Sequence, residues 1–577
     1  MRATRLALLL PVLTYLGVAM LRRGNEPAGD EPRYLLLAES IVSDGDVEVK
    51  NNYAARGTSF PDVLVVKSSR GWYSVHNIGL PLLIAPAWFA GGTLGVKLFL
   101  TLVTGLMPLI VHRIVARLVP SWGWSLLVTL TISLGMPFAD SADQIYPDLL
   151  SGLALLYAAD YVIGRNAGIA ATRLRFIAFV AIVGFLPWLH IKQAAPAVIL
   201  LAGYLGLCPM ERPFRRLALV AVLIGSLSAL ACYNHYAFGN SLGPYGTNEG
   251  LSIDIAKNMM MFCGLFWDQA QGMFLQQPFF LLGLAGLALM WRDVPRGVLW
   301  LALLGTSLVV PNCLHPHAYG GMSFAGRFAW SSVLLWCFPL AYSAQWLWAN
   351  RPRTLVATCA ASMALQVMLA SGWLRGVDRL IQSMPDTPLW AYNSMYPALR
   401  DLLPFWHHAD LLWRHGPNYA FLLFGAGLAV SGWLARGRRR AVWATITIAS
   451  IIVHPLRAPA ANWTPGSTLS GVPASEHSTG IFTILPWLVL KSGEYQVHVE
   501  YTAQAYESAP VGYLVVSFGA DDTQIKELVP TGAEGGETWE YVQVNRRRGR
   551  KGAFVAVTYQ GQGSIEVKRV SIEPLRR

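Results

Sequence analysis

The chain has 577 residues, of which 54% are hydrophobic and 14% are charged; its formal net charge is +12 and its mean hydropathy is +0.40. Soluble domains carry about 25% charged residues, so this composition excludes an ordinary soluble protein and indicates a polytopic membrane protein. Much of the positive charge is arginine in short loops, a pattern typical of membrane orientation rather than of nucleic-acid binding. The six cysteines have no CxxC spacing, so neither a zinc site nor a disulfide framework is indicated.

The first predicted element is an apolar helix from about Leu6 to Leu21, nearly long enough to span a bilayer. No small-residue cleavage pattern follows it, which favours a retained signal anchor. Asp30 and Glu31 come next, ahead of a short amphipathic helix from Tyr34 to Ile41. Two adjacent carboxylates at a membrane surface are costly unless they are solvated, paired or used in chemistry. The pair is equally consistent with Glu31 acting as a first-turn residue of a surface helix.

Hydropathy predicts about thirteen transmembrane helices in residues 1–455. The predicted spans lie near 6–21, 96–114, 124–139, 145–163, 176–190, 194–208, 217–236, 273–290, 297–314, 328–348, 354–373, 417–434 and 441–455. The segment 77–92, which contains Pro81 and Pro86, is expected to form a re-entrant or interfacial helix instead of a full span.

Arginine-rich loops set the predicted orientation. With a cytoplasmic N-terminus, the following residues fall on the cytoplasmic side, as the positive-inside rule requires: Arg113, Arg117, Arg165, Arg173, Arg175, Arg212, Arg215, Arg216, Arg292, Arg296, Arg351, Arg353, Arg436, Arg438, Arg439 and Arg440. Arg22 and Arg23 are the exception. The opposite face then collects most polar residues near membrane depth, which predicts a site open to the non-cytoplasmic side. A transporter would be expected to place such residues near mid-bilayer within internal repeats, and the sequence has no clear repeat.

The composition changes beyond residue 455. Residues 456–480 are rich in Pro, Ser and Gly and are expected to be a linker, and 481–577 alternate with a period of two between glycine-containing turns. This pattern predicts an all-β sandwich. It resembles the small jelly-roll domains found as carbohydrate-binding modules. Exposed aromatics such as Trp539 are candidates for stacking on sugars, although most aromatic residues of such a domain belong to its core.

Four short motifs carry a family resemblance: Asp30–Tyr34, Tyr73–Pro81, Trp267–Gly272 and Gly320–Phe328. The first resembles the Asp-Glu-x-Arg-Tyr motif of bacterial aminoarabinose transferases, and protein O-mannosyltransferases share its acidic pair. Both belong to the GT-C class of polytopic glycosyltransferases, which take sugars from polyprenyl-phosphate carriers. The Lys-Pro-Pro element of aminoarabinose transferases is absent, with His76-Asn77 and Gly79-Leu80-Pro81 in its place, so the resemblance does not specify the donor sugar.

The resemblance implies transfer of a sugar from a polyprenyl-phosphate donor to an acceptor hydroxyl on a glycan, lipid or protein. It implies a bacterial plasma-membrane protein whose outer loop, residues 22–95, carries the acidic motif on the periplasmic or extracellular side. Such a displacement needs a base near the acceptor and cations near the departing phosphate. Asp30 is the first candidate base and Glu31 the second. The candidate phosphate ligands are Arg327, Lys192, His190 and His76.

Arg33, Tyr34, Asp148 and Trp267 are expected to support the site, with Asp148 either pairing with Arg33 or starting a helix. No metal ligands are assigned, because His315 and His317 lack an evident third ligand. No nucleotide-binding loop appears, which agrees with a lipid-linked donor, and the cofactor expectation is none beyond an optional divalent cation. Two other functions stay open: a non-catalytic polysaccharide flippase or assembly protein, and a glycan polymerase or ligase that uses a lipid-linked donor.

Overall fold

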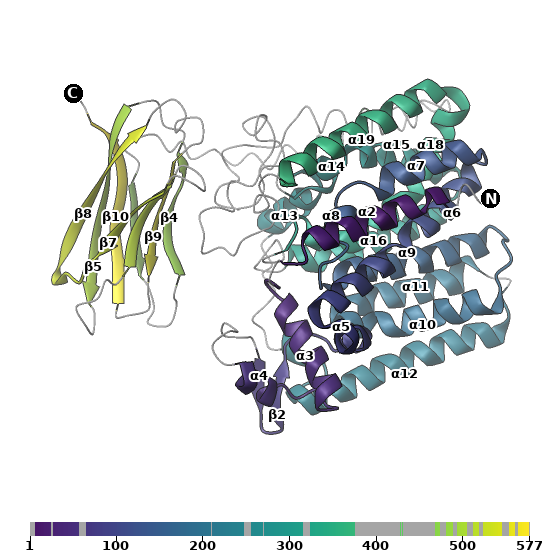
Figure 1. The fold of residues 1–577 in the computed structure, drawn as a ribbon, viewed down its shortest axis with the longest axis horizontal. Coiled ribbons are helices and arrows are strands. Elements are labelled where there is room, and N and C mark those ends of the chain that lie inside the picture. Colours follow the sequence, from purple (N-terminus) through teal and green to yellow (C-terminus); the bar gives the residue numbers. More distant parts are fainter. Residues whose placement is uncertain are drawn as a thin grey trace. The chain divides into compact units, whose positions relative to one another are not determined.

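The computed structural model describes residues 6–24, 27–56, 65–208, 211–246, 255–268, 271–314, 323–374, 427, 430, 468–473, 480–488, 493–504, 512–517, 523–544, 553–559 and 564–575. The chain divides into two compact units, a helical unit and a β unit (Figure 1). Two predicted spans, 417–434 and 441–455, fall almost wholly outside the described residues, so the expected number of thirteen stays a prediction. His315, His317 and the predicted Gly320–Met322 part of the fourth motif also lie outside them.

The helical unit contains most of the predicted spans as helices. Its α-helices are α2 (Leu9–Leu21), α3 (Glu31–Ser43), α4 (Lys50–Arg56), α5 (Gly79–Thr104), α6 (Met107–Leu118), α7 (Trp122–Ser133), α8 (Phe138–Ser141), α9 (Pro147–Asn166), α10 (Arg173–Leu189), α11 (Ala194–Leu207), α12 (Pro213–Phe238), α13 (Ile255–Trp267), α14 (Met273–Gln276), α15 (Leu282–Asp293), α16 (Pro295–Cys313), α17 (Arg327–Val333), α18 (Cys337–Asn350) and α19 (Pro352–Leu374). Its 3-10 helices are η2 (Ile191–Gln193), η3 (Gly243–Gly246), η4 (Pro278–Leu281) and η5 (Leu334–Trp336).

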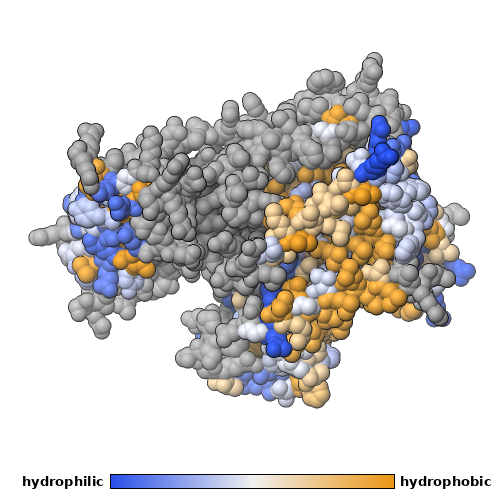
Figure 2. Space-filling model, turned by 45° about the horizontal axis from the view of Figure 1, so that its top comes forward, coloured by the Kyte–Doolittle hydropathy of each residue, from blue (hydrophilic) through white to orange (hydrophobic). Residues whose placement is uncertain are grey.

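The helical unit contains helices whose length and composition are those of an integral membrane protein. Four described stretches are long and apolar enough to cross a bilayer: Gly79–Leu118, Pro213–Phe238, Pro295–Cys313 and Pro352–Ser371. Large apolar side chains such as Leu13, Phe89 and Leu102 are exposed, and Figure 2 shows apolar residues over much of the visible face of this unit. An apolar surface of this extent would be unstable in water and needs lipid to cover it.

The predicted re-entrant segment is the first half of α5. Its helix runs from Gly79, with Pro86 inside, to a break where Gly91 and Gly92 leave the helical conformation. Gly92 has φ +56°, a conformation that L side chains rarely adopt. The chain then continues as helix to Thr104. The proline does not end the helix; the glycine pair interrupts it, and the two halves of α5 therefore have different axes.

Arg22, which departs from the arginine pattern, is held by a specific pair. Its Nη1 lies 2.9 Å from Asp143 Oδ1 and donates to the Asp140 carbonyl at 2.7 Å. The side chains of Arg22 and Asp143 are 9% and 2% exposed, so this is a buried ion pair that ties the end of α2 to the segment after α8.

The described part of the segment between α3 and α5, within the expected outer loop, contains a helix and a hairpin. The strands β1 (Val65–Ser68) and β2 (Gly71–Ser74) form an antiparallel hairpin. Leu36 and Leu37 of α3 pack with Val49 and Ile78 in a small apolar cluster, against which Trp72 of β2 also packs. This cluster fixes the strand that leads to His76 against the helix that follows Asp30.

The β unit consists of two four-stranded antiparallel sheets. Their orders are β3-β10-β5-β8 and β4-β9-β6-β7. The strands are β3 (Thr468–Pro473), β4 (Gly480–Leu488), β5 (Gly493–Gln504), β6 (Gly512–Ser517), β7 (Thr523–Leu528), β8 (Gly532–Val544), β9 (Ala553–Tyr559) and β10 (Ser564–Pro574). Strand β3 lies inside the range expected to be a linker. Both sheets contribute to one buried core, which includes Val497, Val499, Leu514 and Val542.

Candidate functional site

Asp30 lies at the centre of a network of charged side chains. It is the residue that precedes the first turn of α3, and Pro32 in that turn has the fixed φ that favours a helix start. Its Oδ1 accepts a hydrogen bond from Arg33 Nη1 at 2.8 Å, and its Oδ2 accepts one from Arg327 Nη1 at 2.9 Å. His76 Nε2 lies 3.5 Å from Asp30 Oδ1. Two residues of the first motif therefore meet the second and fourth motifs here.

Arg327 continues the network to a second carboxylate. Its Nε donates to Asp148 Oδ2 at 3.0 Å, and Lys192 Nζ donates to Asp148 Oδ1 at 2.7 Å. Of the two roles expected for Asp148, pairing with Arg33 is not found, because it pairs with Arg327 and Lys192; its place at the start of a helix is found. Its place in the first turn of α9 adds the favourable interaction of a carboxylate with a helix N-terminus. Asp148 holds the two cations together because one carboxylate can accept from both.

The position of Arg327 depends on the glycine before it. Gly326 has φ +79°, and a Cβ at this residue would lie 2.6 Å from Gln276 Nε2 and 2.7 Å from the Gln271 carbonyl oxygen. Gln276 Nε2 donates to the carbonyls of Gln271 and Ala325, which fastens the turn from behind. Only glycine combines this conformation with this space. The turn delivers Arg327 as the first residue of α17.

Two residues that sequence reasoning did not name complete the surroundings of the cations. The guanidinium of Arg327 lies 3.9 Å from the ring centroid of Tyr146, a cation–π contact. Asn312 Oδ1 lies 3.4 Å from Lys192 Nζ, and its Nδ2 donates to the Phe328 carbonyl at 2.8 Å. Tyr146 directly precedes Pro147 and Asp148. Asn312 directly follows Pro311 in an otherwise apolar run. A polar residue next to a proline in an apolar segment was the sequence signal that could have pointed to both.

The histidines and Tyr34 occupy supporting positions. The Tyr34 and His76 rings have centroids 4.8 Å apart, so Tyr34 limits the movement of the imidazole. His190 Nδ1 accepts a hydrogen bond from the Lys192 backbone N–H at 3.2 Å, which shapes the turn η2 that carries the lysine. Trp267 packs against Phe274, with ring centroids 4.8 Å apart, as part of the apolar core.

Glu31 has a different environment from Asp30. Its Oε1 accepts from the Ile145 backbone N–H at 2.8 Å and its Oε2 from the Ala28 N–H at 3.1 Å. Burial raises the pKa of Glu31, and the two backbone hydrogen bonds oppose that rise only in part. The side chain fastens the start of α3 to the segment before α9. The two neighbouring carboxylates therefore have different partners: Asp30 pairs with cations, and Glu31 accepts hydrogen bonds from the backbone.

The charge and exposure of the network decide what it can do. It contains three fixed cations, Arg33, Lys192 and Arg327, and two carboxylates, Asp30 and Asp148, so its fixed charge is +1 (3 − 2). Burial alone would raise the pKa of Asp30, but Arg327, His76 and Arg33 hold it well below its usual range. The Asp30 side chain is 22% exposed and Asp148 1% exposed. An incoming group can reach Asp30 but not Asp148.

A second ionic cluster lies toward the other end of α9. Arg113, Arg117 and Arg175 all pair with Asp160, and Arg165 pairs with Glu211. The site and this cluster are therefore separated along one helix, with Asp148 in its first turn and Asp160 near its end. The arginines of this cluster are among those that the positive-inside rule assigns to the cytoplasmic side.

No family model and no curated protein matches the sequence. Among solved structures, the chain is similar to crystal structures of ArnT from Cupriavidus metallidurans, one bound to undecaprenyl phosphate and one in the apo state. The TM-scores are 0.43 and 0.42, at 13% sequence identity over 78% of this chain and 75% of that chain. ArnT is an aminoarabinose transferase of the GT-C class, the class that the sequence motifs resemble. At this identity and score, the similarity identifies neither a substrate nor a site residue.

Proposed function

We propose that the protein is a membrane glycosyltransferase that moves a sugar from a polyprenyl-phosphate donor to an acceptor hydroxyl on the non-cytoplasmic side of a bacterial plasma membrane. The observation that carries the proposal is the network of Asp30, Arg327, Asp148 and Lys192. It combines a reachable carboxylate with two cations in an integral membrane protein. Displacing a phosphate from an anomeric carbon by a hydroxyl needs both groups close together.

In this proposal Arg327 and Lys192 bind the donor phosphate. The guanidinium of Arg327 can give two parallel hydrogen bonds to phosphate oxygens, a geometry that a lysine cannot reproduce. Asp148 and Tyr146 keep Arg327 in place, since one accepts from its Nε and the other lies against its planar face. Lys192 adds charge that matters most when the carbon–oxygen bond to the phosphate breaks and negative charge grows on the leaving oxygen.

Asp30 acts as the base in this proposal. In the network described above its low pKa makes it a weak base, because two arginines stabilise the charged form. A phosphate bound to Arg327 draws that guanidinium away from Asp30 and weakens the stabilisation. The pKa of Asp30 then rises, and the carboxylate becomes a better acceptor for the hydroxyl proton. The base is therefore strengthened only when donor is present.

The test is turnover of defined donors by the purified protein in detergent or vesicles. A panel of polyprenyl-phosphate sugars with candidate acceptors is incubated, and free polyprenyl phosphate and glycosylated acceptor are both quantified. A transferase forms the two in equal amounts. Translocation of a lipid-linked sugar with its phosphate bond intact would contradict the proposal and favour a flippase. Turnover only of donors that carry whole glycans would favour a polymerase or ligase.

The β unit supports a separate proposal, that it binds glycan. The two faces of β8 differ: Val542 and Val544 are buried on one, whereas Trp539 and Tyr541 on the other are 38% and 62% exposed. Exposed aromatic rings on a jelly-roll-like sheet suit stacking on sugar rings. A chain that ends at Ala461 keeps every residue of the network. It should turn over a simple donor at a normal rate and lose affinity for a long glycan acceptor; loss of all turnover in a folded chain would contradict this division.

A further inference from the structure

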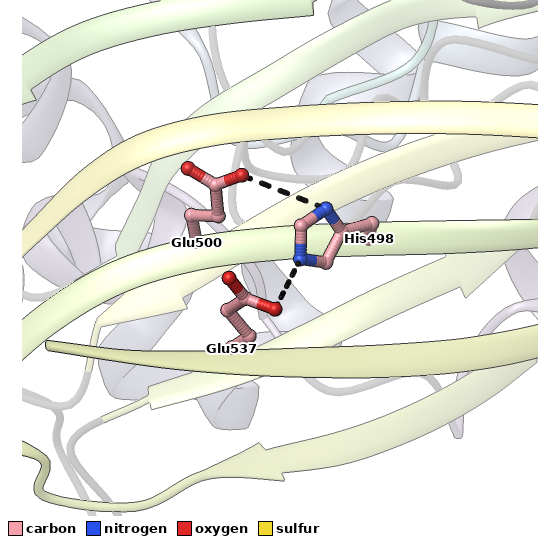
Figure 3. A group of neighbouring side chains, drawn as sticks. All are labelled: His498, Glu500 and Glu537. Atoms are coloured by element: carbon pink, nitrogen blue, oxygen red, sulfur yellow. Dashed lines mark ion pairs between the residues drawn. The ribbon is translucent and has the colours of Figure 1, made fainter.

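The outer face of the sheet β3-β10-β5-β8 carries a histidine between two glutamates. His498 and Glu500 are two residues apart on β5 and so lie on the same face of the sheet. Glu537 of β8 lies directly opposite Glu500 in the antiparallel register, and Trp539 lies directly opposite His498. In Figure 3 the His498 ring stands between the two carboxylates. The closest approaches are 3.9 Å from Nδ1 to Glu500 Oε1 and 3.4 Å from Nε2 to Glu537 Oε2.

This arrangement is unfavourable without a cation. Two carboxylates directly opposite each other on neighbouring strands repel and destabilise the pair of strands. Arg569 compensates in part, with its Nη1 3.8 Å from Glu500 Oε1, but its side chain is 45% exposed and pairs with only one of the two carboxylates. Lys526 lies nearest to Glu540 and Trp539 rather than to Glu537. Among the described residues no lysine or arginine pairs with Glu537, so a cation held between the two carboxylates would relieve their repulsion.

His498 itself points to a ligand. The residue is 7% exposed, and its Nε2 is a buried nitrogen with no hydrogen-bond partner among the described residues. Trp539 covers its ring, with centroids 3.5 Å apart and planes at 11°, so the direction of both nitrogens is fixed. A buried imidazole held in place by a neighbouring group is typical of metal-ligating histidines. A solvated surface histidine would have neither the burial nor the stack.

We propose that His498, Glu500 and Glu537 bind a divalent transition metal ion, with Zn²⁺ the best match. One ligand atom from each residue lies within 4.8 Å of the others. Metal–ligand bonds of about 2.0–2.2 Å in a tetrahedral site put ligand atoms about 3.3–3.5 Å apart. An ion at Nε2 fits the present Nε2–Glu537 distance of 3.4 Å. Glu500, whose closest approach is to the other ring nitrogen, must swing an oxygen to the Nε2 side; the three ligand atoms already lie within 4.8 Å of one another, so a side chain with three rotatable bonds can do this. Imidazole with carboxylates favours zinc over calcium or magnesium, whose ligands are oxygen atoms.

The site would be incomplete on its solvent side. Three protein ligands leave a fourth position, and Glu537 is 57% exposed on its side chain, so this position opens to water. The ion would neutralise the Glu500–Glu537 pair and join the edge strand β8 to β5 without using any residue of the network around Asp30. The inference is therefore independent of the proposed transferase activity.

The experiment measures Zn²⁺ bound to the full chain, with any affinity tag removed and the protein first treated with a chelator. Equilibrium dialysis followed by elemental analysis gives the stoichiometry, and Co²⁺ substitution reports the geometry by its visible absorption. The comparison is between the unaltered chain and His498→Ala, because histidines elsewhere in the chain supply the same background to both. We expect the unaltered chain to bind one more Zn²⁺ per molecule than His498→Ala. Equal binding by the two proteins would overturn the proposal.

Two further variants separate loss of a ligand from loss of folding. Glu537→His replaces one zinc ligand by another, so the variant should keep the extra Zn²⁺. The same change would break a simple ion pair between a His498 imidazolium and Glu537. Glu527→Gln, on β7 of the other sheet, removes an exposed glutamate and should bind like the unaltered chain. Loss of the extra ion in Glu527→Gln, or in Glu537→His with normal folding, would contradict the assignment.

Discussion

At the scale of single residues, the network separates two adjacent carboxylates that look equivalent in the sequence. Asp30 faces cations and water, and Glu31 faces backbone N–H groups in a buried setting. The motif Asp30–Tyr34 suggested both as bases, with Asp30 ranked first and Glu31 second. The choice depends on which side of α3 meets Arg327, 297 residues away along the chain. Packing over that separation is not encoded in any local pattern.

The first prediction concerns Asp30→Asn. This change keeps the size of the side chain and removes the proton acceptor, so transfer should fall by about 10²–10⁴-fold with donor binding largely retained. The measurement is kcat and KM with a donor identified in the panel. Glu31→Gln is the matched control: it should lower stability, because an amide cannot accept from both backbone N–H groups, and leave kcat of the folded protein nearly unchanged. A folded Asp30→Asn protein with near-normal kcat would remove Asp30 from the mechanism.

The second prediction is a pH dependence that differs between kcat/KM and kcat. The folded pKa of Asp30 is depressed below the unfolded value of about 3.9, so its ionised form stabilises the protein above that pH and the contribution is lost only in stronger acid. The free enzyme should therefore show no acidic limb from Asp30 between pH 5 and 8 in kcat/KM. In the donor complex Arg327 is shared with phosphate, so the acidic limb of kcat should lie at higher pH. Coinciding limbs would contradict the exchange of Arg327 between Asp30 and phosphate.

The third prediction concerns Arg327. Arg327→Ala should raise KM and lower kcat together, because the charge acts on the phosphate before and during transfer. Arg327→Lys should restore only part of the activity, since an ammonium cannot give two parallel hydrogen bonds or lie flat on Tyr146. Full recovery with lysine would show that a point charge is sufficient. Arg70, an exposed arginine whose Nη1 donates to the Tyr236 carbonyl, provides a control: Arg70→Lys should change neither constant.

At the scale of elements, the start of α5 has no space for a side chain. A Cβ on Gly79 would lie 2.4 Å from both the carbonyl carbon and oxygen of Trp188 and 2.7 Å from the Leu189 nitrogen. These are backbone atoms at the end of α10, immediately before His190 and Lys192. The close approach of α5 and α10 thus fixes the distance between the segment that carries His76 and the turn that carries Lys192.

The fourth prediction follows from this contact. Gly79→Ala should push the two helices apart and cost about 1–3 kcal/mol of stability, as overpacked sites do. It should also reduce transfer, because Lys192 and His76 move with those helix ends. The measurements are thermal unfolding and kcat/KM in the same detergent. Gly225→Ala in α12, where an added Cβ meets nothing within 4 Å, is the control and should be neutral or slightly stabilising.

Sequence patterns predicted strands with clear alternation better than strands without it. Five strands with clear alternation, β5, β6, β8, β9 and β10, lie where expected. Strand β7 has the sequence TQIKEL, which is too polar to stand out, and β4 contains Pro486, which argues against a strand. The hairpin β1–β2 is held by its apolar contacts with α3, which no local pattern reveals. The His498 site was missed for a related reason, since Glu537 joins it only through strand register.

At the scale of the whole molecule, the arginine distribution yields a fifth prediction. Single cysteines are introduced at Asn51, Gly535 and Asn166 in a chain whose six native cysteines have been replaced. Cysteines at Asn51 and Gly535 should react with an impermeant thiol reagent added from outside, and the one at Asn166 only after permeabilisation. Labelling of Gly535 only after permeabilisation would mean that the number of spans between the network and the β unit is odd rather than even. Outside labelling at Asn166 would reverse the orientation.

Helix α9 carries residues of both ionic clusters, so its geometry gives the distance between the two clusters along the helix axis. Asp148 and Asp160 are twelve residues apart, which is about 18 Å along the axis, whereas the hydrocarbon layer of a bilayer is about 30 Å thick. The two ionic layers cannot both lie at the surfaces of a flat bilayer. The arginines around Asp160 are 23–34% exposed and the cations around Asp148 only 7–11% exposed, so the network near Asp148 is the recessed one. Under the proposed function, a donor phosphate that binds Arg327 therefore descends below the headgroup plane, and its lipid chain leaves sideways between helices.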